Sequence, residues 1–288
     1  MFKQGLFFLL LVLLPQFLRA GGGEYAVSRI PQALLKNAYV VKRAEIISFE
    51  IINTGEAVLR KKYALTILNE NGDRHAGFTE YYDRLHDVKN IEGRLYDAEG
   101  RELKRLKNKQ ILDLTGSDDN NLADDNRLKA HHFYHKVYPY TVEYEVEIRY
   151  NGTLFFPYWS PREDEYFSVE KGIFTVIAPS AYEVRYKVYN YNGQPLAATA
   201  DKGKKSVTWQ VALLPAVESE YASPGWLEIN PVVITGPTEF EIEKYRGDMS
   251  TWEGFGRFIY SLNRGRDQLP LNIKQAVKDI AAGEPDPK

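Results

Sequence analysis

The stretch that decides the fold is Tyr138-Pro-Tyr-Thr-Val-Glu-Tyr-Glu-Val-Glu-Ile-Arg-Tyr150. From Tyr140 onward, tyrosine, valine and isoleucine occupy the even positions, whereas threonine, glutamate and arginine occupy the odd ones. This period of two is typical of a β-strand that has one face in a core and the other, with its row of glutamates, in water. At about 3.3 Å per residue the strand spans roughly 36 Å, so we expect it to cross a whole domain.

The composition limits the classes of protein that fit. The chain has 288 residues, of which 44% are hydrophobic, and it contains 20 Tyr, 14 Phe and 4 Trp. That is enough for one large or two ordinary domains, and the aromatic enrichment favours sheets over a helical bundle. The net charge of -2 provides no global field that would attract nucleic acid, so we expect no nucleic-acid partner.

Residues 1–20 are predicted to be a secretory signal peptide, with Lys3 before an apolar run at 6–14. A membrane anchor is the alternative, but the run is shorter than the ~20 residues of a membrane span, and Pro15 interrupts it. The chain contains no cysteine, which excludes a thiol nucleophile, thiolate metal ligands and lipid attachment through a cysteine. An exported chain without disulfides is typical of the periplasm or cell surface of a Gram-negative bacterium.

The β pattern continues on both sides of the long strand. Two hairpins are predicted, one around Asn53-Thr-Gly-Glu56 and one around Asp97-Ala-Glu-Gly100. Further strands are expected at Phe78–Tyr82, Phe167–Ile177, Tyr182–Val188, Val207–Val211, Val232–Ile234 and Phe240–Ile242. The chain is therefore predicted to be mainly β.

Two helices are expected near the C-terminus. Met249–Leu262 carries one apolar stripe with helical spacing, and Leu271–Ala282 ends before a glycine and a proline. The stripe consists of Trp252, Phe255, Ile259 and Leu262. The predicted organisation is a signal peptide at 1–20, a β-sandwich domain at 21–246 and a helical segment at 247–288.

Two clusters of residues resemble metal sites. The polar segment 113–126 is expected to be a loop, and its carboxylates could bind Ca²⁺, although their spacing is not that of an EF-hand. A solvated turn beside the basic segment 101–109 is the favoured interpretation. His131, His132 and His135 could suggest zinc, but ordinary strand histidines are favoured because a further ligand is missing. We predict no metal and no other cofactor.

No catalytic motif is apparent. The sequence has no Gly-x-Ser-x-Gly elbow and no glycine-rich phosphate loop, so the chain is predicted not to be an enzyme by itself. In the cluster Phe155-Phe-Pro-Tyr-Trp-Ser-Pro161, Tyr158 and Trp159 could stack on a sugar or a peptide. Packing in a core or at a sheet edge is the more common role of such a cluster.

Several short motifs occur in a recognisable order: Ala38-Tyr-Val-Val41, Asp97-Ala-Glu-Gly100, Ala123-Asp-Asp-Asn-Arg127, the strand from Tyr138, and Met249-Ser-Thr-Trp-Glu-Gly-Phe-Gly-Arg-Phe-Ile-Tyr260. Over residues 38–270 the chain resembles the uncharacterised β-rich domain that precedes transglutaminase-like domains in exported bacterial proteins. The resemblance implies a large antiparallel β-sandwich with short C-terminal helices and without known catalytic residues. It also implies that 247–288 begins a truncated transglutaminase-like domain.

The same resemblance directs attention to Asp124, Asp125 and Arg127, which match a short acidic and arginine motif of the family. An arginine beside paired carboxylates would form charge-assisted hydrogen bonds. A structural latch that pins the loop to the sheet is favoured over a ligand site.

Three functions remain open. The first is a non-catalytic exported module that binds a peptide, protein or glycan, or serves as a scaffold for a transglutaminase-like partner domain. The second is the N-terminal part of a transglutaminase-fold peptidase or amide-processing enzyme, whose Cys, His and Asp lie beyond this chain. The third is a carbohydrate-binding module that uses Tyr158 and Trp159.

The long strand gives a first testable prediction. Val146→Asp should place an unpaired charge in the core, cost several kcal/mol and prevent folding. Glu145→Lys should be near neutral if its face meets water. Circular dichroism and urea unfolding of both variants check this, and equal damage from the two changes would mean that the glutamate face is covered.

Overall fold

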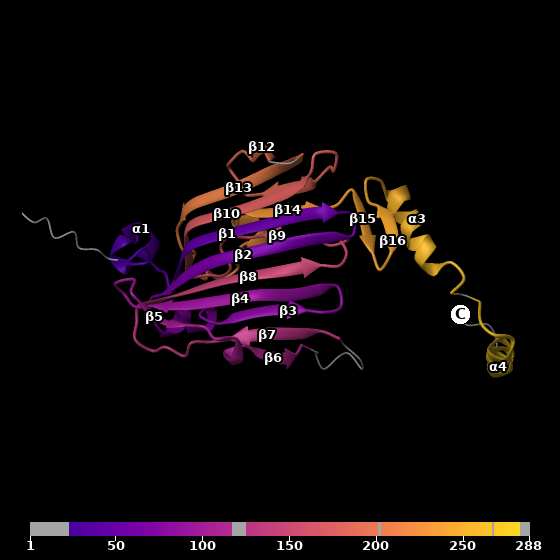
Figure 1. Cartoon of the computed structure of the whole chain (residues 1–288), viewed down its shortest axis with the longest axis horizontal. Helices are drawn as coiled ribbons and strands as arrows, with labels where there is room; N and C mark the ends of the chain where they lie inside the picture. Colours follow the sequence, from indigo (N-terminus) through magenta and orange to yellow (C-terminus); the bar gives the residue numbers. More distant parts are fainter. Residues whose placement is uncertain (1–22, 117–124, 201–202, 267, 283–288) are drawn as a thin grey trace, which may run out of the picture.

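The computed structural model describes residues 23–116, 125–200, 203–266 and 268–282. The predicted signal peptide at 1–20, the Asp118–Asp119 part of the candidate calcium loop and Asp124 lie outside these residues. Strands dominate the described chain, and helices are short apart from two near the C-terminus (Figure 1). The prediction of a mainly β fold is confirmed.

A large sheet of eight strands forms one layer, in the order β12-β13-β10-β1-β2-β8-β4-β5. The strands are β1 (Val40–Asn53), β2 (Glu56–Ile67), β4 (His86–Tyr96), β5 (Glu102–Arg105), β8 (Tyr140–Tyr150), β10 (Phe167–Pro179), β12 (Leu196–Ala200) and β13 (Lys204–Leu214). The strand predicted from Tyr140 is β8, and it pairs antiparallel with β2 and β4. Both predicted hairpins form, as β1–β2 and β4–β5. The sheet is antiparallel except between β1 and β10, which run parallel.

The inward face of β8 lies in the core, as its period of two predicts. Tyr140, Val142, Tyr144, Val146 and Ile148 are at most 4% exposed. Burial of each such side chain contributes about 1.5–3 kcal/mol to the free energy of unfolding, so this strand stabilises the centre of the sheet.

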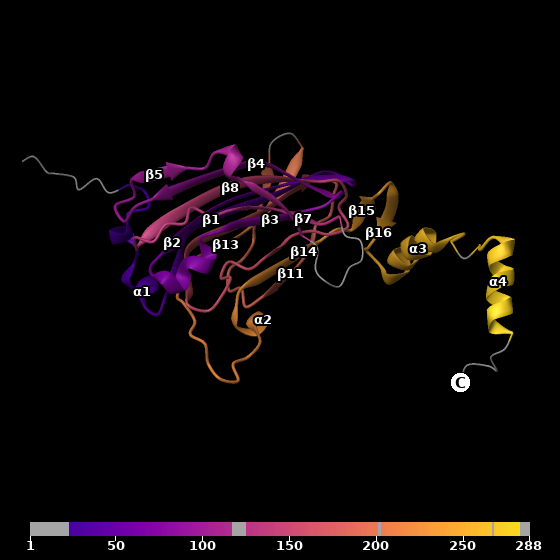
Figure 2. The same ribbon diagram turned by 90° about the horizontal axis from the view of Figure 1, so that it is seen from below.

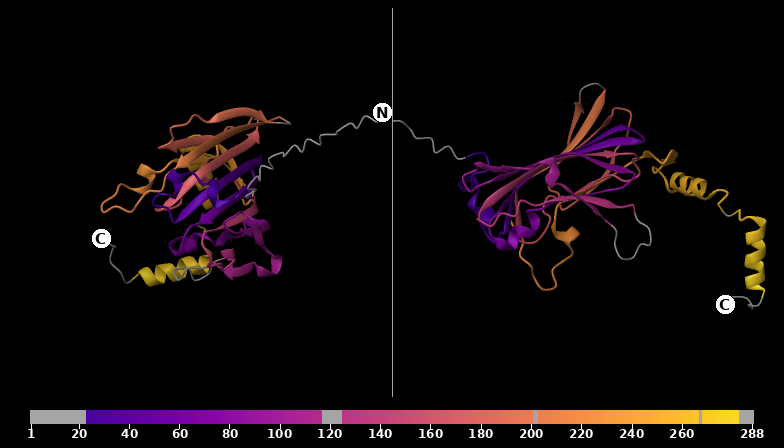
Figure 3. Two further views of the ribbon diagram at one scale, coloured as in Figure 1. Left: turned by 90° about the vertical axis from the view of Figure 1, so that its left-hand side faces the viewer. Right: turned by 60° about the horizontal axis from the view of Figure 1, so that its bottom comes forward.

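A second layer of two small sheets covers this face. One has the order β3-β7-β6, with β3 at Phe78–Tyr82, β7 at Arg127–His131 and β6 at Leu112–Thr115. The other has the order β11-β14-β9, with β11 at Arg185–Tyr189, β14 at Val232–Gly236 and β9 at Tyr158–Trp159. Figures 2 and 3 show the large sheet with these shorter strands beside it.

Aromatic rings join the two layers. The ring of Phe78 in β3 lies 5.3 Å from that of Tyr144, and the ring of Tyr186 in β11 lies 5.0 Å from that of Trp209. Because Tyr144 and Trp209 belong to the same buried cluster, both small sheets pack on one face of the large sheet. The expected antiparallel β-sandwich is therefore the architecture of this chain.

The polar segment 113–126 is not entirely a loop, which corrects the prediction. Its first residues belong to β6, and β7 begins directly after it. The physical reason is cross-strand pairing: Asp113 lies opposite Lys129, with Oδ2 and Nζ 3.1 Å apart, so its charge is compensated within the sheet.

The outer face of β8 is only partly in water. Glu145 is exposed, as predicted, but Glu143 is only 5% exposed. Tyr25, in the N-terminal segment, donates a hydrogen bond to Glu143 Oε2 (2.5 Å), and Arg94 of β4 donates one to Oε1 (2.7 Å). The prediction of a fully solvated face was wrong at this end of the strand, because the N-terminal segment crosses it.

The N-terminal segment contains the short helices η1 (Val27–Arg29) and α1 (Gln32–Leu35). Leu34 is fully buried and belongs to a small apolar cluster with Ile30, Ala38 and Val41 of β1. The hydroxyl of Ser168 in β10 donates to Leu34 O at 2.7 Å. These contacts hold the segment against one end of the large sheet.

The C-terminal part consists of the β15–β16 hairpin (Glu239–Ile242 and Tyr245–Asp248) and the helices α3 (Trp252–Asn263) and α4 (Leu271–Ala281). In Figures 1 and 2 the helices extend away from one end of the sheets. The hydroxyl of Thr251 caps α3, accepting the N–H of Gly254 at 3.0 Å. Within the described residues, no helix is long and apolar enough to cross a membrane.

The stripe predicted for α3 is not its buried face. Trp252 is 90% exposed, whereas Phe258 is 4% exposed and its ring lies 4.8 Å from that of Phe240. Gly254 explains the difference, because a Cβ there would lie only 2.9 Å from Asp248 O. The helix thus approaches the hairpin through Gly254 and Phe258, and Trp252 and Ile259 of the predicted stripe are left exposed.

The buried outer-face cluster leads to a prediction. Glu143→Ala should lower the free energy of unfolding by about 3 kcal/mol, because it leaves Arg94 Nη1 and the Tyr25 hydroxyl without their acceptor. Glu145→Ala, two residues away on the same face, should change it by no more than about 0.5 kcal/mol. Urea unfolding monitored by tryptophan fluorescence measures both, and equal effects would contradict the coverage of Glu143.

Candidate functional site

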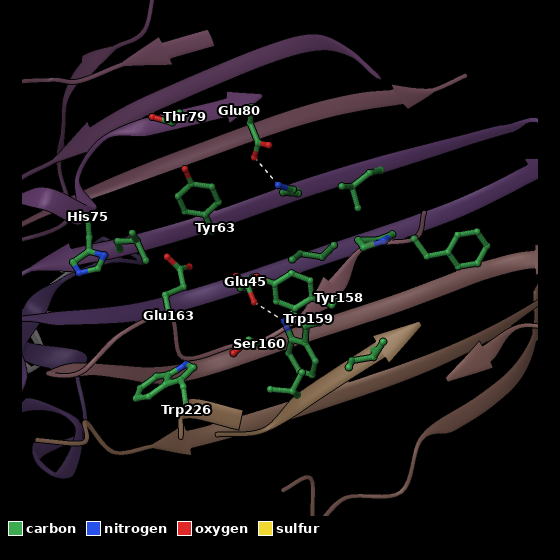
Figure 4. Close-up of a pocket in the computed structure, with 18 of the residues that line it drawn as sticks. Glu45, Tyr63, His75, Thr79, Glu80, Tyr158, Trp159, Ser160, Glu163 and Trp226 are labelled. Atoms are coloured by element: carbon green, nitrogen blue, oxygen red, sulfur yellow. Dashed lines mark hydrogen bonds and ion pairs between the residues drawn. The ribbon is translucent and has the colours of Figure 1, made fainter. Parts of the chain in front are cut away.

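A pocket with a volume of about 1060 Å³ lies over the centre of the large sheet (Figure 4). Inward side chains of β1 and β2 form its floor. One side is formed by β3 and the short helix η2 (Glu70–His75), and the other by residues 156–163, the short helix α2 (Trp226–Ile229) and β14. Its volume is at the upper end of the ~300–1,000 Å³ typical of ligand sites.

The floor combines charged and aromatic side chains. Glu45 and Ile47 of β1 lie opposite Tyr63 and Lys61 of β2, respectively, and all four line the pocket. These are inward positions, which elsewhere on the two strands are mostly apolar. A charged group at such a position is costly unless it is paired, so the partners of Glu45 and Lys61 define the site.

Lys42 holds the centre of this arrangement. A β-bulge between Lys42 and Ala44 shifts the register of β1, and the Lys42 side chain is fully buried. Its ammonium donates to Glu45 and lies 2.7 Å from Glu163 Oε1. Burial by itself would lower the pKa of Lys42, but the carboxylates of Glu163 and Glu45 outweigh it and raise the pKa, so Lys42 is charged.

Trp159 links this charged cluster to the second layer. Its indole N–H donates to the second oxygen of Glu45 at 2.7 Å. The ring lies beside Phe174, and the space it fills exists because Gly172 has no side chain: a Cβ there would meet the indole at 3.1 Å. Trp159 therefore fixes the segment that carries Glu163 across the sheet.

Glu163 is the acidic group that the pocket presents most openly. Its side chain is 49% exposed, and only Oε1 contacts Lys42. Within the described part of the chain, no hydrogen bond is made by Oε2. Burial would raise the pKa of Glu163, but the Lys42 ammonium outweighs it and lowers the pKa, so the group is ionised at neutral pH.

The β3 side adds a second ion pair. Lys61 Nζ lies 2.6 Å from Glu80 Oε1, and Thr79 is exposed at the pocket. Burial raises the pKa of Tyr63 well above its usual value, so its hydroxyl remains protonated. Figure 4 shows the Tyr63 ring between Glu80 and Glu163.

Helix η2 closes one end of the pocket. Arg74 Nη2 lies 2.5 Å from Asp164 Oδ2, which anchors the segment just after Glu163. The ring of His75 packs edge-on against Phe167, with centroids 5.2 Å apart. Burial lowers the pKa of His75, so its imidazole is neutral at pH 7.

The opposite wall is held by hydrogen bonds to the main chain and to a serine. Asn230, which is fully buried, donates from Nδ2 to Ser160 Oγ and to Arg162 O, both at 2.7 Å. Thr235 of β14 donates to Pro157 O at 2.7 Å. This wall is formed by contacts within the protein, so it needs no ligand to hold its shape.

Both predicted aromatic residues line the pocket, in different ways. Tyr158 is 70% exposed, whereas Trp159 is 2% exposed. The two residues are consecutive in β9, so their side chains point to opposite faces. Of these two residues, only Tyr158 has a ring face that a ligand can reach.

The predicted acidic and arginine motif lies outside the pocket. Arg127 Nη2 donates to Asp113 Oδ1 at 2.8 Å, and Arg127 Nε donates to the Tyr82 hydroxyl at 2.9 Å. The hydroxyl of Tyr82, with Lys129 and Arg127, lowers the pKa of Asp113 to about 2. These contacts tie β6, β7 and β3 together. Asp125 Oδ2 lies 4.0 Å from Arg84 Nε and does not join the cluster.

The three histidines do not gather around one point. The ring of His131 is hydrogen-bonded to the Tyr144 hydroxyl at 2.9 Å, and His135 packs edge-on against Tyr140. Among the described residues, no group of three or more histidine or acidic side chains is arranged to hold a metal ion.

Most pocket residues were not predicted from the sequence. Lys61 and Tyr63 occupy inward positions of a strand with a period of two, and that pattern could have identified them. Lys42 and Glu45 are three residues apart, so a regular strand would place them on opposite faces; only the bulge brings them together. Glu163 lies in a loop, and no sequence pattern around it identifies it as a pocket residue.

Comparisons with known proteins place the chain in a family. Residues 53–218 match the family model described as "Domain of Unknown Function with solved-structure structure (DUF3857)". The match covers the pocket-lining residues from Leu59 to Glu163. A search of curated proteins finds no match.

Among solved structures, the chain is similar to a protein of Parabacteroides distasonis ATCC 8503 named as a "putative protease", with 12% identity and a TM-score of 0.64. The similarity covers 86% of this chain and 47% of that one, so this chain spans about half of its length. An M1 zinc metallopeptidase from Deinococcus radiodurans gives a TM-score of 0.34 at 7% identity, over 73% of this chain and 46% of the other. The first similarity shows the fold alone.

The buried histidines give a pH prediction. Burial lowers the pKa of His75, and burial together with His132 lowers that of His131, so both take up a proton more readily in the unfolded chain. The free energy of unfolding should therefore fall as the pH drops from 7.5 through 6.5 to 5.5, by up to about 1.4 kcal/mol per pH unit for each histidine.

Urea unfolding at the three pH values measures this slope. A double variant, His75→Asn with His131→Asn, should lose most of it. Stability that increases toward pH 5.5, or an unchanged slope in the double variant, would contradict the assignment.

Proposed function

The chain belongs to the DUF3857 family of domains of unknown function, and on that premise we propose that it is a non-catalytic binding and scaffolding module of an exported protein. Its ligand site is the pocket over β1 and β2. The signal-like pattern of residues 1–20 supports export. The proposed location is the periplasm or cell surface of a Gram-negative bacterium.

One observation carries the proposal: the pocket floor holds buried charges at positions where a β-sandwich ordinarily has apolar side chains. An apolar sandwich floor would be at least as stable, because burial of an ion pair costs desolvation that the attraction between the charges seldom exceeds. Sequences depart from such local rules chiefly at functional sites. The charged floor, the open carboxylate of Glu163 and the exposed ring of Tyr158 together suit ligand binding.

The pocket groups favour binding over catalysis. Lys61 is paired with Glu80, and Lys42 with Glu45 and Glu163, so both side chains are engaged in ion pairs and are not placed as nucleophiles. The sequence contains no cysteine. The glycan alternative is disfavoured because the buried indole of Trp159 leaves Tyr158 as the one exposed ring of the predicted pair.

The scaffolding role concerns the helices. Trp252 of α3 and Leu271 and Ile280 of α4 are at least 80% exposed, which leaves apolar surface open for a further domain. We infer that a transglutaminase-like domain packs there in the parent protein. A second candidate function follows, in which the chain is the N-terminal part of a peptidase or amide-processing enzyme. The similar protein named as a "putative protease", of which this chain spans about half, agrees with it.

A pocket-filling variant tests the binding role. The full chain is screened by thermal shift against mixed peptides and oligosaccharides, where a ligand at 100 times its Kd should stabilise the fold by about 2.7 kcal/mol. Thr79→Trp should remove the shift, because Thr79 is exposed at the pocket. Thr115→Trp, exposed on β6 of the same small sheet and outside the pocket, should keep it.

The proposal fails if no compound shifts the transition, or if Thr79→Trp and Thr115→Trp respond alike. Turnover of any compound by the isolated chain, detected by mass spectrometry, would contradict the non-catalytic assignment.

A further inference from the structure

We propose that the pocket takes an extended peptide, which inserts as a β-strand between β3 and β9 and presents a lysine or arginine side chain to Glu163. The proposal rests on the binding function above and names the class of ligand. It is drawn from the two sheet edges that border the pocket, their separation and the charge between them.

Each side of the pocket is an open sheet edge. In the described part of the chain, β3 pairs only with β7, and β9 pairs only with β14, so each is the terminal strand of its sheet. Thr79 and Glu80 of β3 and Tyr158 and Trp159 of β9 all line the pocket. The unpaired N–H and C=O groups of a terminal strand are the groups to which an added strand binds.

The separation of the two edges suits one strand. Contacts place β3 over β2 and β8 (Lys61–Glu80, Phe78–Tyr144), and they place β9 over β1 through the hydrogen bond from Trp159 to Glu45. Neighbouring strands lie about 4.8 Å apart, so an inserted strand needs its two partners about 10 Å apart. The ring of Trp159 also packs against Phe174 of β10, so β9 stands over β10 and β1, whereas β3 stands over β2 and β8. These two pairs of strands are two places apart in the large sheet, which corresponds to about 10 Å.

The charge in the pocket favours a basic side chain. Three carboxylates, those of Glu45, Glu80 and Glu163, face two ammonium groups, those of Lys42 and Lys61. Arg74 is paired with Asp164 outside this set, and burial keeps His75 neutral. Glu163 is ionised, and its Oε2 is free to accept a charge-assisted hydrogen bond from a ligand.

The aromatic residues of the pocket suit a peptide strand as the ligand better than a sugar. Side chains of an inserted strand alternate between the floor and the outer side of the layer. Phe156, Tyr158 and Trp226 line the pocket and offer apolar contact to these side chains. Stacking on a sugar ring requires an open aromatic face, and of Tyr158 and Trp159 only Tyr158 offers one.

The experiment begins with selection from a randomised decapeptide display library on the full chain. The proposal predicts enriched peptides that contain lysine or arginine and do not bind Thr79→Trp. Their Kd, measured by isothermal titration calorimetry, should rise about tenfold in Glu163→Gln, the value expected when a charge-assisted hydrogen bond is lost. Glu145→Gln, an exposed glutamate outside the pocket, should leave the Kd unchanged.

N-methylation of the peptide tests the strand geometry without changing the protein. A strand between two edges uses both alternate sets of its amides, so N-methylation of either set should weaken binding at least tenfold. An effect of one set alone would mean addition to a single edge, and no effect of either would mean that the ligand is not a strand. Each of these results overturns the proposal.

An oligosaccharide array run in parallel distinguishes failure of the strand proposal from failure of the binding function. If a glycan binds the chain and not Thr79→Trp while no peptide is enriched, the strand proposal is wrong and the binding function stands. If enriched peptides bind Thr79→Trp as well as the unmodified chain, the pocket is not their site and the strand proposal also fails. If neither class binds, both proposals fall.

Discussion

The structure depends on one constraint, which is that the buried ammonium of Lys42 must have two carboxylates within reach. A buried ammonium without partners costs several kcal/mol, so its position dictates those of Glu45 and Glu163. Glu45 in turn accepts the indole N–H of Trp159, which brings β9 onto the large sheet. A single buried charge thus couples the register of β1 to the placement of the second layer.

This coupling explains why the second layer is divided. The aromatic contact of Phe78 with Tyr144 holds the β3-β7-β6 sheet over β8. The hydrogen bond from Trp159 to Glu45 holds the β11-β14-β9 sheet over β1. Polar residues occupy the floor between them, where Lys61 and Tyr63 face inward. An apolar floor there would favour closure of the layer by further apolar contacts, whereas the charged floor favours an open gap, which is where we propose that the ligand binds.

The sequence predicts what is local and misses what is long-range. A period of two and glycine-containing turns identify β8 and the two hairpins, because each depends on neighbouring residues. The parallel pairing of β1 with β10 joins Val40 to Phe167, and no local pattern encodes it. The apolar stripe of α3 gave the wrong buried face, because Gly254 permits an approach that periodicity does not foresee.

The candidate site shows the same division. Tyr158 and Trp159 were found because aromatic residues are conspicuous, but their exposures of 70% and 2% depend on which face of β9 meets the sheet. Glu163 was missed because its role arises only from its contact with Lys42, 121 positions earlier in the chain. Charged floor residues are recognisable only when a strand assignment shows that they face inward.

Amide hydrogen exchange by mass spectrometry, with and without a selected decapeptide, tests the central claim most directly. If the ligand bridges the two sheet edges, exchange should slow in both 78–82 and 158–159, while 112–115 in the outer strand β6 of the first small sheet stays unchanged. Protection of neither edge, or of one edge alone, would contradict the account.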